Sequence, residues 1–333
     1  MIRFIVIALL WCTAALGQSG ANGVFTFLDR SAFAGTAALG NMSFVNPGAS
    51  SAYAVQNPIL LVDSTLGQLE FSTGGVGAGV RTLQSSYGFK MGGRPFIAFV
   101  QSVQYGTFDG TDIWGTAAGT FAASDVALGL GTTLYTLGPV NFGMNLKVVN
   151  GSYESYQSWA ATTDLVAMYK AEGRPDVAIM LRNFGTQLTT FSGNKEPLPL
   201  DVVLAVGDKL EHAPLRWTLV LDRLQQPMLG YDDPNTQTVD PLTGQVVQGE
   251  QSVLNLMLRH FGGALELMPT ERLHLLMGYC FRRQFELALP ERRTSGGFSG
   301  GVALYFSKFQ LHFAHELRSV AGRANTLSLT LNL

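Results

Sequence analysis

The stretch that decides the fold is residues 327–333, which read Leu-Ser-Leu-Thr-Leu-Asn-Leu. Successive side chains of a β-strand point to opposite faces, so a strand here carries leucines on one face and Ser, Thr and Asn on the other. Left at the edge of a sheet in water, such a strand invites pairing with other chains. In a closed barrel it has two neighbours, its leucines meet lipid and its polar face meets the lumen. The stretch therefore favours a membrane barrel over a sandwich strand.

The composition indicates the same class. Charged residues make up 14% of the chain, against about 25% in soluble domains. Glycine accounts for 38 of 333 residues, and aromatic residues reach 11%. Beyond the first residues no apolar run is long enough for a membrane helix, which is typical of barrels, where apolar residues alternate along each strand. The net charge of −2 gives no sign of nucleic-acid binding.

The first 17 residues have the pattern of an export signal. Arg3 supplies a positive charge, residues 4–11 are apolar but too short to span a bilayer, and residues 14–17 offer small side chains for cleavage. We expect cleavage after Gly17, with an N-terminal membrane anchor as the alternative. Trp11 in front of Cys12 argues against a lipoprotein signal.

Alternating residues and turn formers predict fourteen antiparallel strands with loose boundaries. The predicted strands are residues 66–73, 80–89, 95–108, 115–131, 137–154, 157–170, 176–191, 201–208, 216–223, 261–267, 272–285, 297–305, 309–317 and 324–333. Outer-membrane barrels have short periplasmic turns and longer outer loops. If the first strand runs outward, the short connections and both termini are periplasmic; these connections are residues 91–94, 132–136, 171–175, 209–215, 268–271 and 307–308.

The segment between signal and barrel predicts a plug. Phe25 and Phe27 precede a helix-prone, alanine-rich stretch over residues 32–39, which Gly40 closes. Asn57 and Pro58 follow in a second apolar segment. A free periplasmic tail is the alternative, but it would leave these phenylalanines exposed. We therefore expect three parts: a signal peptide over residues 1–17, a plug or hatch over residues 18–65 and a transmembrane barrel over residues 66–333.

The longest connection, residues 224–260, predicts an outer loop with two halves. Its first half contains the turn formers Tyr231, Asp232 and Asp233. Its second half contains apolar residues at helical spacing followed by a cation, which predicts a short amphipathic helix. That helix either packs on the barrel rim or docks a partner, and its residues are Val253, Leu254, Met257, Leu258 and Arg259.

A set of motifs in order along the chain resembles the PorQ family, outer-membrane components of the type IX secretion system of Bacteroidota. Ile59 departs from the family's opening, which usually has Ala after Asn-Pro, and so does the short glycine-rich stretch 74–79. The motifs that carry the resemblance are residues 25–29, 37–40, 56–60, 124–129, 151–156 with Asp164 and Tyr169, 181–185, 210–214, 259–260, 278–279 with Arg282 and Arg283, 297–300 and Phe309.

The resemblance implies a fourteen-stranded barrel similar to the long-chain fatty-acid transporter family, in the outer membrane of a Gram-negative bacterium. It also implies a role in the complex that attaches secreted cargo to the cell surface. A PorZ-like surface protein is then the expected direct partner, with PorU and PorV in the same complex. No enzymatic activity and no cofactor is implied.

Motifs for catalysis or metal binding find little support. Ser192 and Lys195 match a Ser-x-x-Lys motif without its companion elements, and residues 75–79 lack the spacing of a dinucleotide loop. His312 and His315 are three apart, so in a strand they face opposite ways and do not share a metal. After signal cleavage Cys280 is the one cysteine, which excludes a disulfide framework.

Charged clusters in the predicted outer loops have ordinary explanations. Asp109 and Asp112 predict a solvated loop face, and Asp232 and Asp233 predict another, with calcium binding at the long loop as the alternative. The arginines near the outer end of the eleventh strand are expected to bind phosphates of lipopolysaccharide on the rim, or a partner; they are Arg282, Arg283, Arg292 and Arg293.

Two functions remain open. One is a non-enzymatic scaffold that holds an exoplasmic partner, which needs a large, partly apolar outer surface. The other is a carrier or channel for hydrophobic molecules, which needs an apolar pocket of about 300 Å3 or more behind the plug and a lateral gap in the wall. A barrel fold is compatible with both.

Overall fold

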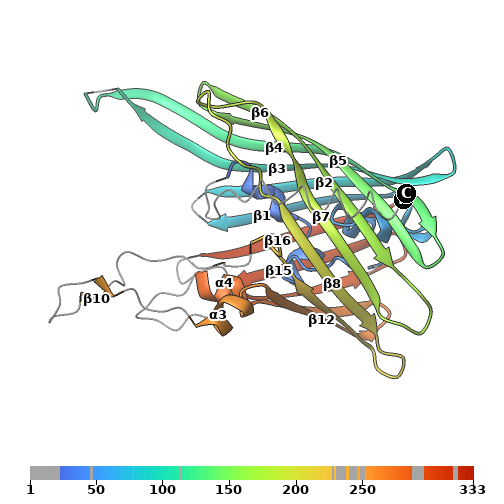
Figure 1. Ribbon diagram of the computed structural model, residues 1–333. Helices are drawn as coiled ribbons and strands as arrows, with labels where there is room; N and C mark the ends of the chain where they lie inside the picture. Colours follow the sequence, from blue (N-terminus) through green and yellow to red (C-terminus); the bar gives the residue numbers. More distant parts are fainter. Residues whose placement is uncertain are drawn as a thin grey trace.

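The computed structural model describes residues 23–45, 48–77, 79–112, 114–226, 229, 238–239, 246–247, 252–286, 296–317 and 322–333. The predicted signal peptide lies outside these residues, as do Tyr231, Asp232 and Asp233. The described chain forms one closed antiparallel barrel of fourteen strands, around a short N-terminal segment (Figure 1). The predicted fold class is confirmed.

The fourteen wall strands follow one another around the barrel in chain order, and a separate two-stranded sheet of β10 (Thr238–Val239) and β11 (Val246–Val247) lies outside it. The wall strands are β1 (Gln68–Gly77), β2 (Val80–Met91), β3 (Arg94–Thr111), β4 (Ala117–Leu137), β5 (Val140–Tyr153), β6 (Tyr156–Tyr169), β7 (Asp176–Thr189), β8 (Asp201–Lys209), β9 (Leu215–Leu221), β12 (Phe261–Thr270), β13 (Leu273–Cys280), β14 (Phe298–Tyr305), β15 (Phe309–Leu317) and β16 (Arg323–Asn332).

Strand β16 closes the barrel in the way that its alternation predicts. It pairs with β15 on one side and with β1 on the other, with Leu329 opposite both Leu311 and Phe71. Ser328 and Thr330 are fully buried in the lumen, whereas Leu327 is exposed on the outer surface. Because both neighbours are present, the backbone groups of this last strand are paired on both edges.

The short connections gather at one end of the barrel together with the C-terminus, and the long ones at the other end (Figure 1). We call the first end periplasmic and the second outer. One predicted turn is wrong, because β4 continues to Leu137 and pairs Tyr135 with Phe142. The turn therefore falls at Gly138, whose φ of +56° suits a tight reversal.

A second correction concerns the eleventh predicted strand. It ends at Cys280, and residues 281–286 form helix α4 (Phe281–Glu286) instead of extended chain. In that helix Arg282 forms an ion pair with Asp222 at 2.7 Å, which draws the chain over the rim rather than along the wall. The predicted helix in the long loop is confirmed as α3 (Val253–Leu258).

The outer surface of the wall is a band of exposed apolar side chains. Leu128, Leu146, Leu219 and Leu265 all point outward from different strands. An exposed apolar band on a closed barrel matches the hydrocarbon layer of an outer membrane, where every backbone polar group must be paired within the sheet. The chain is therefore an outer-membrane barrel. No helix in the described part of the chain is long and apolar enough to span a membrane.

The lipid-facing band yields a stability test. Leu265 lies near the middle of β12. Replacing it with Arg should lower the free energy of unfolding in lipid vesicles by about 2–4 kcal/mol, because the cation must enter hydrocarbon. The matched control is Leu210→Arg, since Leu210 is an exposed leucine in the turn between β8 and β9 and should tolerate the charge. Equal effects of both substitutions on urea unfolding in vesicles would contradict this placement of the membrane.

Candidate functional site in the plugged lumen

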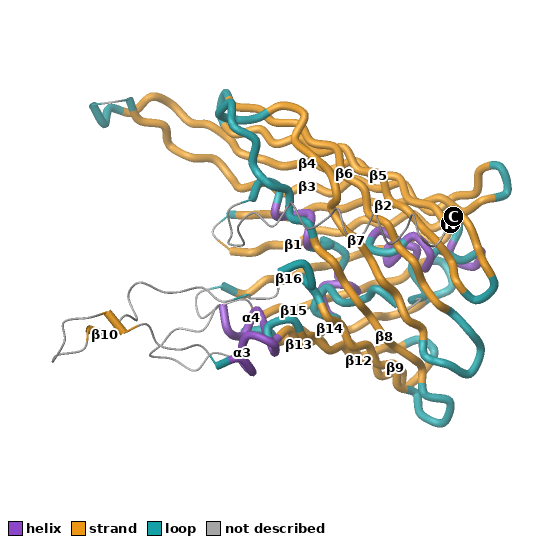
Figure 2. Tube along the Cα trace, viewed as in Figure 1, coloured by secondary structure: helices purple, strands orange, loops and turns teal. Residues whose placement is uncertain are grey.

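The N-terminal segment fills the barrel with short helices linked by turns (Figure 2). Gly40 follows the alanine-rich helix of this segment with a φ of +69°, as the sequence predicts. These helices are η2 (Thr26–Asp29), α2 (Ala34–Ala38), η3 (Ser51–Val55), η4 (Pro58–Leu60) and η5 (Asp63–Thr65). We refer to residues 23–65 as the plug.

The centre of the plug packs tightly against the wall. Phe33 is fully buried, and its ring meets the edge of Tyr53 at 5.0 Å and the ring of His312 on β15 at 4.8 Å. Helix α2 packs on β14, β15 and β16, and this close approach is possible because it is built from Ala, Gly and Thr. The plug and the wall therefore share one apolar core.

Hydrogen bonds hold the plug to the strands where the barrel closes. The Ala34 amide donates to Ser328 Oγ at 2.8 Å, and the Ala32 amide donates to Gln84 Oε1 at 3.2 Å. Gln84 lies within 3.4 Å of the fully buried carboxyl group of Glu70, which also accepts from Ser86 Oγ at 3.0 Å. The wall side of this contact thus consists of hydroxyl, amide and carboxyl groups from β1, β2 and β16.

On the other side of the lumen, a bulge in β7 turns two consecutive side chains inward. Thr163 pairs with Phe184 and Leu165 pairs with Leu181, so two residues of β7 oppose Asp164 alone. These are Arg182 and Asn183, and both are buried. Asn183 has a φ of +55°, a conformation that Asn tolerates better than most residues. The bulge therefore places the Arg182 guanidinium and the Asn183 side-chain amide next to each other in the lumen.

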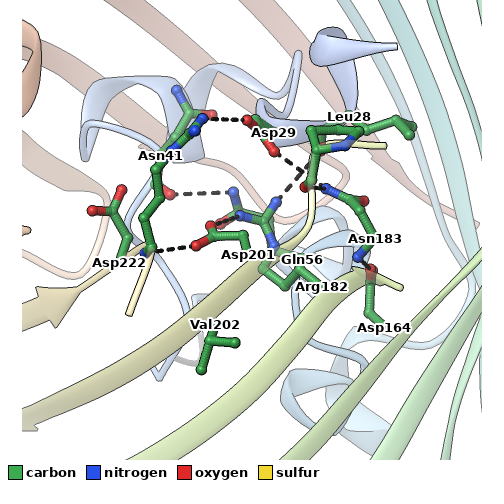
Figure 3. Close-up of polar contacts among 12 residues, drawn as sticks. Leu28, Asp29, Asn41, Gln56, Asp164, Arg182, Asn183, Asp201, Val202 and Asp222 are labelled. Atoms are coloured by element: carbon green, nitrogen blue, oxygen red, sulfur yellow. Dashed lines mark hydrogen bonds and ion pairs between the residues drawn. The ribbon is translucent and has the colours of Figure 1, made fainter. Parts of the chain in front are cut away.

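A charged cluster surrounds this bulge (Figure 3). Lys147 Nζ lies 2.7 Å from Asp164 Oδ1 and donates to Asn183 Oδ1 at 2.6 Å. Asp164 Oδ1 also accepts from the Asn183 amide at 2.8 Å. Arg182 pairs with Asp201 on β8 at 3.3 Å. The wall alone thus supplies two cations and two carboxylates, all of them buried.

The plug enters this charged cluster through Asp29. Its carboxylate accepts from Asn183 Nδ2 at 3.2 Å and pairs with Arg223, just after β9, at 2.9 Å. The next plug residue, Arg30, pairs with Glu316 of β15, four strands round the barrel from β9, at 2.8 Å. Glu316 also lies 3.2 Å from Arg283 of α4. Two adjacent residues of opposite charge therefore hold the plug to two parts of the wall.

Burial changes the pKa values of two carboxyl groups at this site that lie outside the strands, Asp29 and Asp222. Burial raises the pKa of Asp29 above its ordinary value, and the positive charge of Arg223 lowers it only in part. Burial likewise raises the pKa of Asp222 to about 6, although Arg282 lies beside it. The ionised Asp29 carboxylate is therefore held at a net cost and depends on its cation.

Two hollows adjoin the plug. One, of about 20 Å3, lies in the lumen beside Lys147, Asp164 and Arg182, and is large enough for about one water molecule. The other, of about 530 Å3, is an open groove at the periplasmic mouth, bounded by Ile59 and Leu61 of the plug and by the turns of the wall. The exposed cations Arg94 and Lys170 also line this groove.

The structure separates the predicted plug residues into two places. Phe25 and Phe27 are buried in a second apolar cluster with Phe191 packed against it. Asn57 is fully buried elsewhere, where its Oδ1 caps η4 by accepting from the Ile59 amide at 3.0 Å and its Nδ2 donates to the Phe44 carbonyl at 2.6 Å. Pro58 is the first residue of that helix, a position that needs no amide donor.

Among the described residues, the predicted partner-binding side chains of the outer loop lie on α3 and at Arg259, which directly follows it. Val253, Leu254 and Met257 are 66%, 63% and 59% exposed, so they leave an apolar surface uncovered by the described chain. Leu258 is half-buried. Arg259 points inward, donates to the Leu229 carbonyl at 3.0 Å and lies over the ring of Phe285.

The structure also places the histidines, acidic residues and cysteine that the sequence analysis considered. His312 is buried in the lumen while His315 bonds Asn325 on the exposed side, so they do face opposite ways. The Asp112 carboxylate caps its own turn by accepting from the amides of Trp114 and Thr116. The described residues contain no group of side chains suited to a metal ion. Cys280 is buried and free. Arg292 and Arg293 lie outside the described residues.

Sequence reasoning missed the charged cluster, although a signal was present. Lys147 and Asp164 each stand at a lumen-facing position of a strand whose neighbours are apolar or small. A charge in such a strand is costly unless it meets an opposite charge in the lumen. Asp29 and Arg30 lacked such a signal, because their partners are separated from them by 194 and 286 residues.

The fold and the filled lumen together define a plugged outer-membrane barrel, and several solved structures resemble this chain in fold. The toluene transporter TodX of Pseudomonas putida is 12% identical, with a TM-score of 0.56 over 92% of this chain and 99% of that one. The toluene transporter TbuX of Ralstonia pickettii is 10% identical, with a TM-score of 0.51 over 92% and 98%. CymD, a monoaromatic hydrocarbon channel, is 12% identical, with a TM-score of 0.52 over 90% and 97%.

No protein-family model and no curated protein matches the chain. The likeness to the three solved barrels therefore establishes the shared fold, which the topology above shows independently.

The plug contact of Asp29 gives a first test at this site. Arg223→Ala should speed amide hydrogen exchange of residues 25–41 by about tenfold or more, since it leaves a buried carboxylate without its cation. Asp29→Asn should change exchange little, because the amide can still bond Asn183 and needs no countercharge. Exchange measured by mass spectrometry on the barrel in detergent checks both. If Asp29→Asn accelerated exchange as much as Arg223→Ala, an Asp29 carboxylate left without its cation would not be the cause of plug release.

The wall cluster gives a second test. Lys147→Met should destabilise the barrel by about 3–5 kcal/mol, because Asp164 is left as a buried, unpaired charge. The double variant Lys147→Met/Asp164→Asn should recover part of that loss, since the amide oxygen can still accept from the Asn183 backbone. Guanidinium unfolding followed by tryptophan fluorescence measures both. A double variant no more stable than Lys147→Met would show that the charge of Asp164 is not the cause.

Proposed function

We propose that this chain is a non-enzymatic anchor of the type IX secretion system, of the PorQ kind, which holds an exoplasmic PorZ-like surface protein in the cargo attachment complex. PorU and PorV are its proposed companions there. The proposal rests first on the motifs that resemble that family, and second on how the lumen is built. Its coarser part, an outer-membrane barrel, follows from the fold.

The observation that carries the proposal is the filled lumen. A site for a small hydrophobic molecule needs about 300 Å3 or more and a mostly apolar lining. The described hollow next to the plug holds about 20 Å3 and is bounded by Lys147, Asp164 and Arg182. Ion pairs of Asp29 and Arg30 with two separate parts of the wall oppose movement of the plug. A barrel closed in this way suits an anchor better than a conduit.

The outer end supports the same proposal. Val253, Leu254 and Met257 present an apolar surface on α3, at the end of the barrel opposite the C-terminus (Figure 1). A cluster of apolar residues on an exposed helix more often marks a surface for protein contact than a surface that remains in water. An anchor needs such a surface outside the membrane.

The second candidate is a channel for hydrophobic molecules. Two features favour it: the fold shared with barrels described as toluene transporters, and the periplasmic groove of about 530 Å3 beside Ile59 and Leu61. The groove lies beyond the plug, so a molecule from outside reaches it only if the plug moves.

Co-purification tests the proposal. The tagged chain, extracted from native outer membrane in mild detergent, should recover a large surface protein in near-equal amount by mass spectrometry. The triple variant Val253→Ser/Leu254→Ser/Met257→Ser should lose most of it, whereas Leu210→Ser at the periplasmic end should not. Recovery of the unmodified barrel alone, with lipid or hydrocarbon bound, would contradict the anchor and favour the channel.

A further inference from the structure

The hairpin of β3 and β4 extends well beyond its neighbours at the outer end (Figure 1). On one side, β2 pairs with β3 as far as Arg81 opposite Gln104. On the other side, β5 pairs with β4 only from Tyr153 opposite Ala123. Residues 105–111 and 117–122 therefore pair with each other and with no further strand in the described part of the chain. We call residues 105–122 the outer hairpin.

The direction of the backbone groups along the outer hairpin follows from one hydrogen bond. The Ala122 carbonyl accepts from the Glu154 amide at 3.2 Å, so it points away from β3. Its partner Thr107 must then also direct its amide and carbonyl away from the hairpin, because the two form a pair without mutual hydrogen bonds. Two residues on, Asp109 repeats this arrangement. Both residues therefore present amide and carbonyl groups on the edge that β2 leaves uncovered.

This edge is short, because it lies between β-bulges at Gln104/Gly106 and at Asp109/Thr111. Proteins protect exposed edges with Lys, Pro, a short strand or a covering segment. The outer hairpin has no Lys or Pro, and its charged residues are Asp109 and Asp112. The carboxylate of Asp112 is already used by its own turn. The edge is thus open to another strand and carries little charge to repel one.

Aromatic side chains flank the open edge. Phe108 and Phe121 stack across the outer hairpin at a centroid distance of 5.4 Å. Trp114 at the tip is 81% exposed. Trp and Phe are enriched at protein interfaces, where they supply contact area at low entropic cost. The acidic residues disfavour the anionic lipopolysaccharide surface as an alternative occupant, because like charges repel.

We propose that the outer hairpin is a docking surface that receives an extended strand of the exoplasmic partner protein, which pairs with β3 along the edge that includes Thr107 and Asp109. This inference deepens the anchor function proposed above and rests on it. Backbone hydrogen bonds would supply the register, and Trp114 and Phe108 would supply apolar contact. The hairpin, marginal as an isolated pair of strands, would gain a third strand.

Proline scanning tests the edge. Thr107→Pro and Asp109→Pro each remove one outward amide, and the pair of changes should lower recovery of the partner about tenfold. Thr107→Ala and Asp109→Ala keep the amides and should recover it fully. Heat-dependent migration of the barrel in gels confirms that every variant folds. Full recovery with both prolines in place would overturn the docking surface, while the anchor function would still stand on the unmodified protein.

Photocrosslinking gives a readout that does not depend on co-purification. A photoreactive benzoylphenylalanine replaces Thr107 in cells, and another replaces Thr136 at the periplasmic end as control. A crosslink from position 107 to an extended segment of an exoplasmic protein, absent from position 136, supports the proposal. A crosslink to a second copy of this chain or to lipid alone overturns it. Failure of the unmodified barrel to co-purify a partner would count against the anchor function separately.

Discussion

The structure depends on one constraint: within lipid, every backbone amide and carbonyl needs a partner inside the protein. The sheet meets this constraint by closing, with β16 between β15 and β1. Closure then fixes the two faces of each strand, so that Leu327 meets lipid and Ser328 meets the lumen. The polar inner face in turn requires partners, and the plug supplies them. The plug is thus a consequence of how the barrel is built.

Ion pairs join the plug to the wall, so each part loses charge partners when the other is removed. Without the plug, Arg223 and Glu316 would lose the contacts to Asp29 and Arg30. In each pair at least one side chain is partly exposed, so water compensates part of the loss when one member is removed. These contacts therefore define one plug position and oppose others.

The alternation of apolar and polar residues made the fold class, the strand number and the α3 helix predictable, because those features depend on local periodicity. Details set by distant contacts were not predictable in the same way. The bulge at Asn183 arises where Asp164, Lys147 and the plug meet, and periodicity within β7 carries no trace of it. Likewise β13 gives way to α4 because Arg282 finds Asp222 across the rim. The expected loop at Asp109 is wrong, because β3 continues to Thr111 and pairs Asp109 with Thr120, and the open edge of the outer hairpin depends on where β2 and β5 end.

The measurement that tests the central claim most directly is the conductance of the purified, unmodified barrel in a planar lipid bilayer. We expect no steady conductance, because the plug fills the lumen and ion pairs hold it to the wall. A variant lacking residues 23–65 serves as the open reference. A stable open channel in the unmodified protein, similar to that of the deletion, would contradict the account and favour transport through the lumen.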